Sequence, residues 1–197
     1  MKALDWVKYL ELQYRSHNKV VFTVTELANV SDVALNSMNV QVGRLVRRGI
    51  VTRYANGRYG LPGTVTPEIL VPSLDSHAYI SGAYALYRHN LITQAQTEIC
   101  CVTNRRHNRS RSRDTPIGRL VFVCVRPPIY AAPDGGGAMA GPEQALCDYV
   151  YLLGRRGLDV RTLATFRGLN RLNADTLATV VARYPATVSR NVEEIVG

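Results

Sequence analysis

Residues 23–61, TVTELANVSDVALNSMNVQVGRLVRRGIVTRYANGRYGL, constrain the fold of this chain more than any other stretch. Leu27 and Ala28 lie on the apolar side of a short helix, with Thr25 as its expected N-cap. Ser31 gives a second N-cap signal almost at once. The stretch therefore predicts two helices joined by a tight turn.

A longer second helix is expected over residues 32–48, because Leu35, Met38, Val42 and Leu45 recur at spacings of three and four. Such side chains form one stripe that faces a core. With about 100° between successive residues, the opposite face is fixed by geometry. It carries Asn36, Ser37, Val40, Gly43, Arg44 and Arg47, and no carboxylate beyond Asp32 at its start.

This polar face has the side chains that read base edges in a DNA major groove. Arginine pairs with guanine and asparagine with adenine through two hydrogen bonds, and serine bonds to either. Gly43 also permits close approach of the backbone. A polar helix face is more often simply solvated, so that alternative stays open. The capped helices, the acid-free face and the hairpin that follows together favour DNA binding.

The hairpin is predicted over residues 50–59, after Gly49 ends the helix, because Asn56-Gly57 is a strong turn signal between two β-rich segments. Residues 20–23 are expected to add a short strand, and residues 3–15 an amphipathic first helix. This order is that of a winged helix-turn-helix over residues 1–65. Its expected phosphate contacts are Arg48, Arg53 and Arg58.

The net charge of +9 is concentrated in this first part of the 197-residue chain. Residues 1–65 carry nine basic and four acidic side chains, and the remainder fifteen and eleven. Such a field attracts nucleic acid or another polyanion. All three lysines, Lys2, Lys8 and Lys19, lie near the N-terminus, which excludes a Walker-A lysine or a Schiff base in the rest of the chain.

The remainder predicts a second, smaller domain. Residues 66–74, with two prolines, are expected to be a linker, and residues 75–197 alternate short β-rich runs, at 98–103 and 119–125, with helical segments. We therefore expect an α+β protein, with an N-terminal winged helix-turn-helix followed by a small mixed α/β domain. No segment has the apolar length of a membrane span, and the four cysteines lack metal-ligand spacing. A cytoplasmic protein with reduced thiols is expected.

A basic run between the two β-rich segments is a possible second surface for nucleic acid or a partner. A solvated loop is an equally good interpretation, although arginine with serine suits phosphate contacts. Its arginines are Arg105, Arg106, Arg109, Arg111 and Arg113.

Catalysis is not expected. Ser81 with His77 or His89 suggests a nucleophile, but no Gly-x-Ser-x-Gly turn surrounds Ser81, and a role as helix N-cap explains it. Glu143 and Asp148 are five residues apart on one predicted helix and do not share a face. No catalytic residue, metal ligand or cofactor is therefore expected.

Three segments, RLVRRGIVTRYANGRYGLP, HAYISGAYALYRHNLI and AMAGPEQALCDYVYLL, carry a resemblance over nearly the full chain. With them, the chain resembles the AbiEi family of antitoxins of type IV toxin-antitoxin systems. The most specific matches are the wing, the helix start at Tyr79, Ser81, Ala85 and Leu86, and a helix with Pro142, Glu143, Ala145, Leu146 and Asp148.

The resemblance implies a repressor of its own operon that binds inverted repeats in the promoter, as a monomer or a weak dimer on DNA. It also implies a C-terminal domain that counters a nucleotidyltransferase-like toxin without forming a stable complex with it. Pro142, Glu143, Leu146 and Asp148 are then structural rather than catalytic. An alternative is an antitoxin module that binds RNA or protein, in which the basic run of the C-terminal domain carries the activity.

Overall fold

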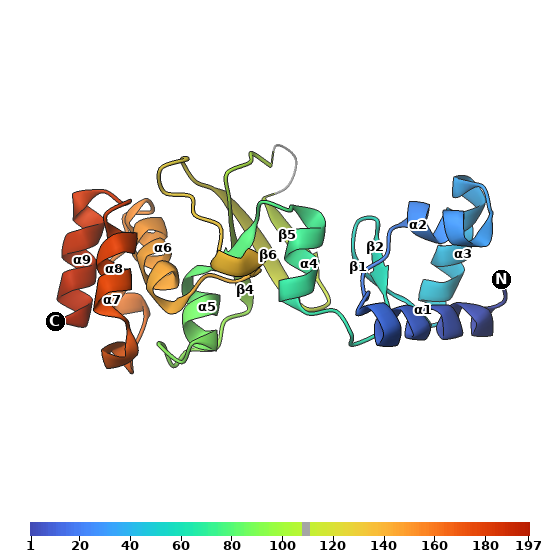
Figure 1. Cartoon of the computed structure of the whole chain (residues 1–197), viewed down its shortest axis with the longest axis horizontal. Helices are drawn as coiled ribbons and strands as arrows, with labels where there is room; N and C mark the ends of the chain where they lie inside the picture. Colours follow the sequence, from blue (N-terminus) through green and yellow to red (C-terminus); the bar gives the residue numbers. More distant parts are fainter. Residues whose placement is uncertain (108–110) are drawn as a thin grey trace.

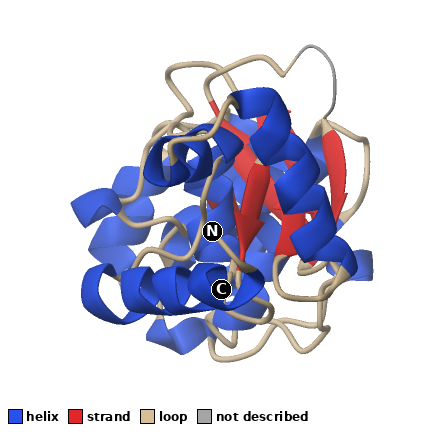
Figure 2. Cartoon of the chain, turned by 90° about the vertical axis from the view of Figure 1, so that its right-hand side faces the viewer, coloured by secondary structure: helices blue, strands red, loops and turns tan. Residues whose placement is uncertain are grey.

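The structure is a computed structural model of the chain and describes residues 1–107 and 111–197. It is an α+β protein, as predicted, with a mixed sheet between two helical regions (Figure 1). The N-terminal helices and a hairpin lie at one end, and the C-terminal helices lie at the other. In the view along the long axis, helices lie in front of and behind the strands (Figure 2).

The N-terminal elements are α1 (Ala3–His17), α2 (Val24–Ser31), α3 (Leu35–Arg47), β1 (Thr52–Ala55) and β2 (Arg58–Gly60). The middle of the chain forms α4 (Pro67–Leu74), β3 (Tyr79–Ser81), α5 (Gly82–Arg88), β4 (Glu98–Thr103), β5 (Ser112–Thr115) and β6 (Gly118–Cys124). The remaining elements are α6 (Pro142–Gly154), α7 (Val160–Leu163), α8 (Ala174–Val181), α9 (Ala186–Val196) and the short 3₁₀ helices η1 (Asp134–Gly136) and η2 (Leu169–Arg171).

The first three helices enclose an apolar cluster of their own. Trp6 and Leu10 of α1, Met38 and Val42 of α3, and Phe22 are each at most 2% exposed. Burial of such side chains is the main favourable term in folding. This cluster packs against only one side of α3.

The cap of α2 differs from the predicted one. Thr23, and not Thr25, is the N-cap: its hydroxyl oxygen accepts the Glu26 N–H at 3.2 Å, and the Glu26 carboxylate accepts the Thr23 N–H at 2.7 Å. A capping box requires the acid three residues after the cap, and only Thr23 has Glu26 at that distance. Ser31 is not an N-cap either, since it ends α2 and donates to the Leu27 carbonyl at 2.9 Å.

The hairpin forms as predicted. Strands β1 and β2 pair antiparallel around Asn56-Gly57, with Gly57 at a φ of +68°. Phe22 adds a bridge to Tyr59, with N···O distances of 2.8 and 2.9 Å in the two directions. The short strand expected before α2 is therefore present as a single bridge.

The expected linker, residues 66–74, is instead the helix α4. Pro67 occupies a first-turn position, where the missing N–H costs nothing. Leu70 and Val71 are completely buried between the hairpin and the sheet. The prolines suggested a break in structure, but the apolar residues between them form part of a core.

The sheet has the strand order β3-β4-β6-β5. Strands β4 and β6 are parallel, and β3 and β5 run antiparallel to their neighbours. Both β-rich runs in the sequence are thus confirmed as strands. The parallel pair ends on one edge of the sheet, at Thr103 and Cys124.

Each face of the sheet is covered by a different set of elements. Cys101 and Phe122 face α4 and Tyr54 of the hairpin, whereas Cys100 packs toward the layer of α5 and α6. Neighbouring residues of a strand point to opposite faces, so the two cysteines pack into different layers.

Local sequence signals mark the start of two of the C-terminal helices. Pro142 starts α6, and the Asn173 side chain caps α8 by accepting the Thr176 N–H at 2.9 Å. Nearly all of α6 is buried, because α5, α8 and α9 pack around it.

Candidate nucleic-acid interface

The outer face of α3 is open to solvent. Met38, Val42 and Leu45 are buried as predicted, but Leu35, expected in the same stripe, is 49% exposed because α3 only begins there. The residues predicted to read bases, all of them exposed, are Asn36, Ser37, Val40, Arg44 and Arg47. The structure therefore brings the predicted face together on one side of one helix.

The arginines at the end of this face are not neutralised. Among the described residues, Arg44, Arg47 and the exposed Arg48 form no ion pair with a carboxylate. Val40, at the middle of the face, is 54% exposed. An uncompensated cationic helix with an exposed valine at its centre is suited to a polyanionic partner that also offers apolar groups.

A three-residue turn fixes how α3 follows α2. Asp32 takes a left-handed conformation with φ at +51°, and the Val33 N–H donates to the Ala28 carbonyl at 3.2 Å. The two helices contact each other along the apolar cluster. A short turn of this kind is typical of helix-turn-helix proteins.

The two hairpin arginines have different environments. Arg53 is exposed and donates to the Asn56 side chain at 2.8 Å, so it stays available at the turn. Arg58, the other predicted phosphate contact of the hairpin, is half-buried and hydrogen-bonded within the protein. Its Nε and Nη2 both donate to the Ser73 carbonyl of α4, at 2.9 and 2.6 Å.

The basic run of the second part is only partly free. Arg105, Arg106 and Arg111 are exposed, whereas Arg113 stacks 4.8 Å from the centre of the Phe122 ring. Arg109 lies outside the described residues. Arg113 therefore packs against the sheet as well as carrying a charge. A surface for a partner would consist of the other three described arginines, Arg105, Arg106 and Arg111.

A buried carboxylate, Asp75, anchors the start of this basic run. It accepts hydrogen bonds from the Thr103 hydroxyl at 2.7 Å, the His107 ring at 2.9 Å and the His77 N–H at 2.9 Å. Burial acts to raise the pKa of Asp75, but these hydrogen bonds and the His107 charge outweigh it, so the pKa lies below its ordinary value. Sequence reasoning missed this cluster, because its members come from separate segments.

A second buried carboxylate, Asp148, lies at the centre of the C-terminal part. Four groups donate to it, namely Ser81 at 2.7 Å, Tyr184 at 2.8 Å, Tyr79 at 3.1 Å and Gln144 at 3.3 Å. Burial raises the pKa of Asp148, and these hydrogen bonds offset only part of that effect. Three of the residues that carry the resemblance to AbiEi antitoxins thus meet in one core network.

Ser81 therefore has a different role from the predicted one. It stands at the N-cap position of α5 but makes no side-chain cap, since its hydroxyl donates to Asp148. His89 bonds to the Ala140 carbonyl at 2.8 Å, and His77 to Asn104 at 3.0 Å. Neither histidine is hydrogen-bonded to Ser81.

Residues 1–107 and 111–197 give little support for a metal site, a reactive cysteine or a membrane-spanning helix. No group of three or more His, Cys, Asp or Glu side chains there could hold a metal ion. Burial raises the pKa of Cys100 and Cys147 to about 12, so both thiols stay protonated and unreactive. No helix in these residues has the length and apolar character needed to cross a membrane.

We predict that Asp148 makes folding more favourable at acid pH than at neutral pH. Its pKa in the folded chain is raised above the ordinary value of about 3.9, so its contribution is complete below that value and is lost as the pH rises through the folded pKa. The measurement is urea unfolding of the wild type and of Asp148→Asn at a series of pH values, from below about 3.9 up to neutral pH. The stability of the wild type relative to the variant should fall as the pH rises.

The exposed Asp114→Asn, on β5, is the matched control and should show a much smaller change. Glu26 and Asp75, whose lowered pKa values give the opposite pH dependence, are present in every variant, so their effect cancels. A difference between wild type and Asp148→Asn that is constant with pH would contradict the prediction.

Comparison with protein-family models found no match, and comparison with curated proteins found none either. The function is therefore argued from the arrangement of the residues. In that arrangement, the exposed face of α3 and the tip of the β1-β2 hairpin are the groups best suited to bind a ligand from solution.

Proposed function

We propose that the N-terminal part is a winged helix-turn-helix that binds double-stranded DNA through α3. The observation that carries the proposal is the outer face of α3, which is exposed, cationic and unpaired with carboxylates among the described residues. An α-helix fits the major groove of B-DNA, and the β1-β2 hairpin follows α3 as a wing.

The proposed contacts divide by chemistry. Asn36 near the start of α3 and Arg47 near its end have the donors and acceptors for base edges, with Ser37 and Arg44 beside them. Val40 lies between them and suits a thymine methyl group, which would remove its exposed surface from water. Base readout is thus assigned to α3 alone.

Phosphate contacts are assigned to Arg48 and Arg53, which are exposed on either side of the hairpin start. Contacts of this type position a protein on the duplex and make binding depend on salt. Arg58 is left out, because the Ser73 carbonyl occupies its guanidinium.

The biological setting we propose is autorepression. The protein would bind inverted repeats in its own promoter, with two copies placed about one helical turn, ~34 Å, apart. Through its C-terminal part it would counter a nucleotidyltransferase-like toxin without forming a stable complex. This setting rests on the resemblance of the sequence to AbiEi antitoxins.

A second candidate is an antitoxin module in which the C-terminal part binds RNA or protein. It is favoured by Arg105, Arg106 and Arg111, which are exposed and make no ion pair with a carboxylate among the described residues. In that case the polar face of α3 would serve only solubility.

We predict that Arg47→Ala weakens binding to the promoter DNA by about 1–3 kcal/mol and relaxes specificity at one base position. The reason is the loss of a bidentate pair to guanine. Fluorescence anisotropy with the promoter fragment and with a set of single-base variants measures both effects. Arg190→Ala, an exposed arginine on α9, is the control and should bind as the wild type does. Unchanged affinity of Arg47→Ala for every sequence would refute the assignment.

The two hairpin arginines give a matched pair. We expect Arg53→Ala to weaken binding to all DNA sequences alike and to reduce the slope of log affinity against log salt by about one. Arg58→Ala should leave that slope unchanged and lower the melting temperature, because it removes two hydrogen bonds to α4. Titrations at several salt concentrations and thermal unfolding separate the two outcomes. Equal salt slopes for the two variants would show that the hairpin does not contact phosphate in this way.

Co-expression with the proposed nucleotidyltransferase-like toxin separates the two candidate functions. Two variants are compared, one with Asn36, Arg44 and Arg47 changed to alanine, and one with Arg105, Arg106 and Arg111 changed to glutamine. If autorepression is the main role, the first variant should derepress a promoter reporter and the second should not. Rescue from the toxin that survives the first set of changes but fails with the second would favour the RNA- or protein-binding module.

A further inference from the structure

A small cavity lies beside the start of β3, where Tyr79 pairs with Val102 of β4. It has a volume of about 110 Å³, and residues on three segments line it, among them Pro72, Tyr79, Tyr130, Pro133 and Gly136. The cavity is separate from the outer face of α3.

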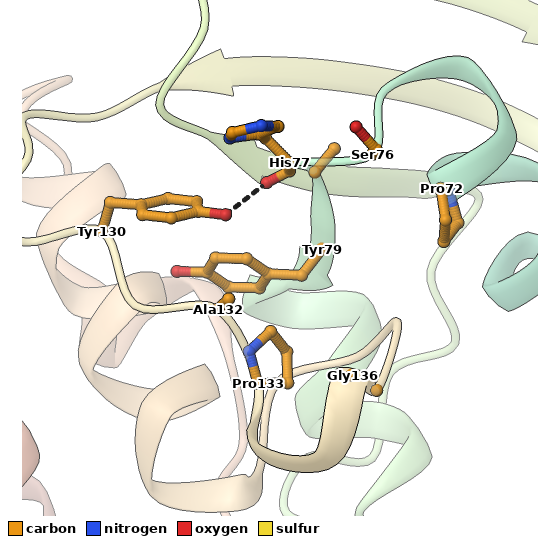
Figure 3. A pocket seen from close by; sticks show the side chains of 10 residues that line it. Pro72, Ser76, His77, Tyr79, Tyr130, Ala132, Pro133 and Gly136 are labelled. Atoms are coloured by element: carbon orange, nitrogen blue, oxygen red, sulfur yellow. Dashed lines mark hydrogen bonds between the residues drawn. The ribbon is translucent and has the colours of Figure 1, made fainter.

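The walls of this cavity are flat. The rings of Tyr79 and Tyr130 lie 5.8 Å apart, centre to centre, with an angle of 49° between their planes. Figure 3 shows Pro72 across the cavity from the two rings and Pro133 and Gly136 below them. Tyr130 is only half-buried, so part of its ring remains open. Flat aromatic and proline surfaces beside a glycine backbone suit a planar ring.

One cationic group, Arg105, is bonded to His77, which lines the cavity. The Tyr130 hydroxyl donates to the His77 carbonyl at 2.8 Å, which holds the tyrosine ring in place (Figure 3). The His77 ring bonds through Nδ1 to the Asn104 side-chain oxygen at 3.0 Å and through Nε2 to Arg105 Nη2 at 2.6 Å. Because the Asn104 oxygen only accepts and Arg105 only donates, Nδ1 carries the proton and Nε2 accepts.

This arrangement fixes Arg105 without neutralising it. Its bond to His77 uses one guanidinium N–H, and neither Arg105 nor Arg106 pairs with a carboxylate among the described residues. The nearby Asp75 carboxylate already accepts hydrogen bonds from Thr103 and His107. Arginine binds phosphate through two parallel N–H groups, and Arg105 has such donors left.

We propose that this cavity binds a nucleoside monophosphate, with the base against Tyr130 and the phosphate on Arg105. Stacking of a base on an aromatic ring tolerates any base. The cavity is small compared with the roughly 300–1,000 Å³ of typical ligand pockets, so it takes the base alone and leaves the phosphate at the rim. The nucleotide is either free or the phosphorylated end of an RNA strand, and both present the same chemistry.

The test is isothermal titration calorimetry of the full chain with AMP, CMP, GMP and UMP, and with adenosine and inorganic phosphate as part-ligands. We expect saturable binding of the nucleotides at millimolar concentrations or below, and binding of each part-ligand weaker by about tenfold or more. Inorganic phosphate that binds as well as AMP would overturn the nucleotide assignment, and so would the absence of binding by every nucleotide.

Binding measurements on variants test whether the ligand lies in the cavity. Arg105→Gln should weaken AMP about tenfold and leave adenosine unaffected, whereas Tyr130→Ala should weaken both. Tyr130→Phe keeps the ring and guards against misfolding of the alanine variant, and it should retain most of the affinity. Nucleotide binding that is the same in Arg105→Gln and Tyr130→Ala as in the wild type would overturn the proposal.

Two further comparisons identify the source of the ligand and exclude the DNA-binding face. A 5′-phosphorylated RNA oligonucleotide that binds more tightly than AMP, and more tightly than its 5′-hydroxyl form, assigns the site to an RNA end. Tighter binding of AMP assigns it to a free nucleotide. Arg47→Ala should bind AMP as the wild type does, and a loss there would overturn the proposal. The outcome is thus independent of whether α3 binds DNA.

Discussion

The arrangement of the whole chain depends on the burial of α4 between the hairpin and the sheet. Leu70 and Val71 are fully buried, with Tyr54 of the hairpin on one side and Phe122 of the sheet on the other. Fully burying side chains of this size stabilises by roughly 1.5–3 kcal/mol each. α4 and α3 lie on opposite sides of the hairpin (Figure 1), and the polar face of α3 is exposed to solvent.

Charge is distributed according to this packing. The buried carboxylates Asp75 and Asp148 are each surrounded by hydrogen-bond donors from several segments, and the buried Glu143 accepts the Asn173 N–H at 2.8 Å. The arginines of α3 have no such partners among the described residues, and they stay in water, where a charge costs little. The buried acids are thus hydrogen-bonded within the protein, and the exposed arginines of α3 are available to polyanions.

Local patterns predicted most of the elements, because caps, turns and periodicity act over a few residues. The stripe on α3 and the Asn56-Gly57 hairpin are examples. The helix α4 was missed, since its prolines signal a break and only burial against distant segments makes it a helix. The predicted N-cap at Thr25 is wrong, because Glu26 lies three residues after Thr23 and forms the capping box with it.

The candidate site was predictable only where it lies on one element. The exposed residues of α3 follow from helical geometry and were placed correctly on one face. The partner of Arg58 is fifteen residues away, and Ser81 and Asp148 are separated by sixty-seven. Contacts at such separations depend on how the elements pack, and no local pattern contains that information.

The bond between Arg58 and the Ser73 carbonyl has a consequence for how the chain unfolds. The last turn of α4 has no basic side chain of its own, and the hairpin supplies the positive charge that its free carbonyls attract. The N-terminal part likewise needs α4, because Tyr54 and Val65 would otherwise face water. We expect the two parts to lose their structure together in a single cooperative transition, and a chain cut at residue 65 to yield two fragments that are each less stable than the whole.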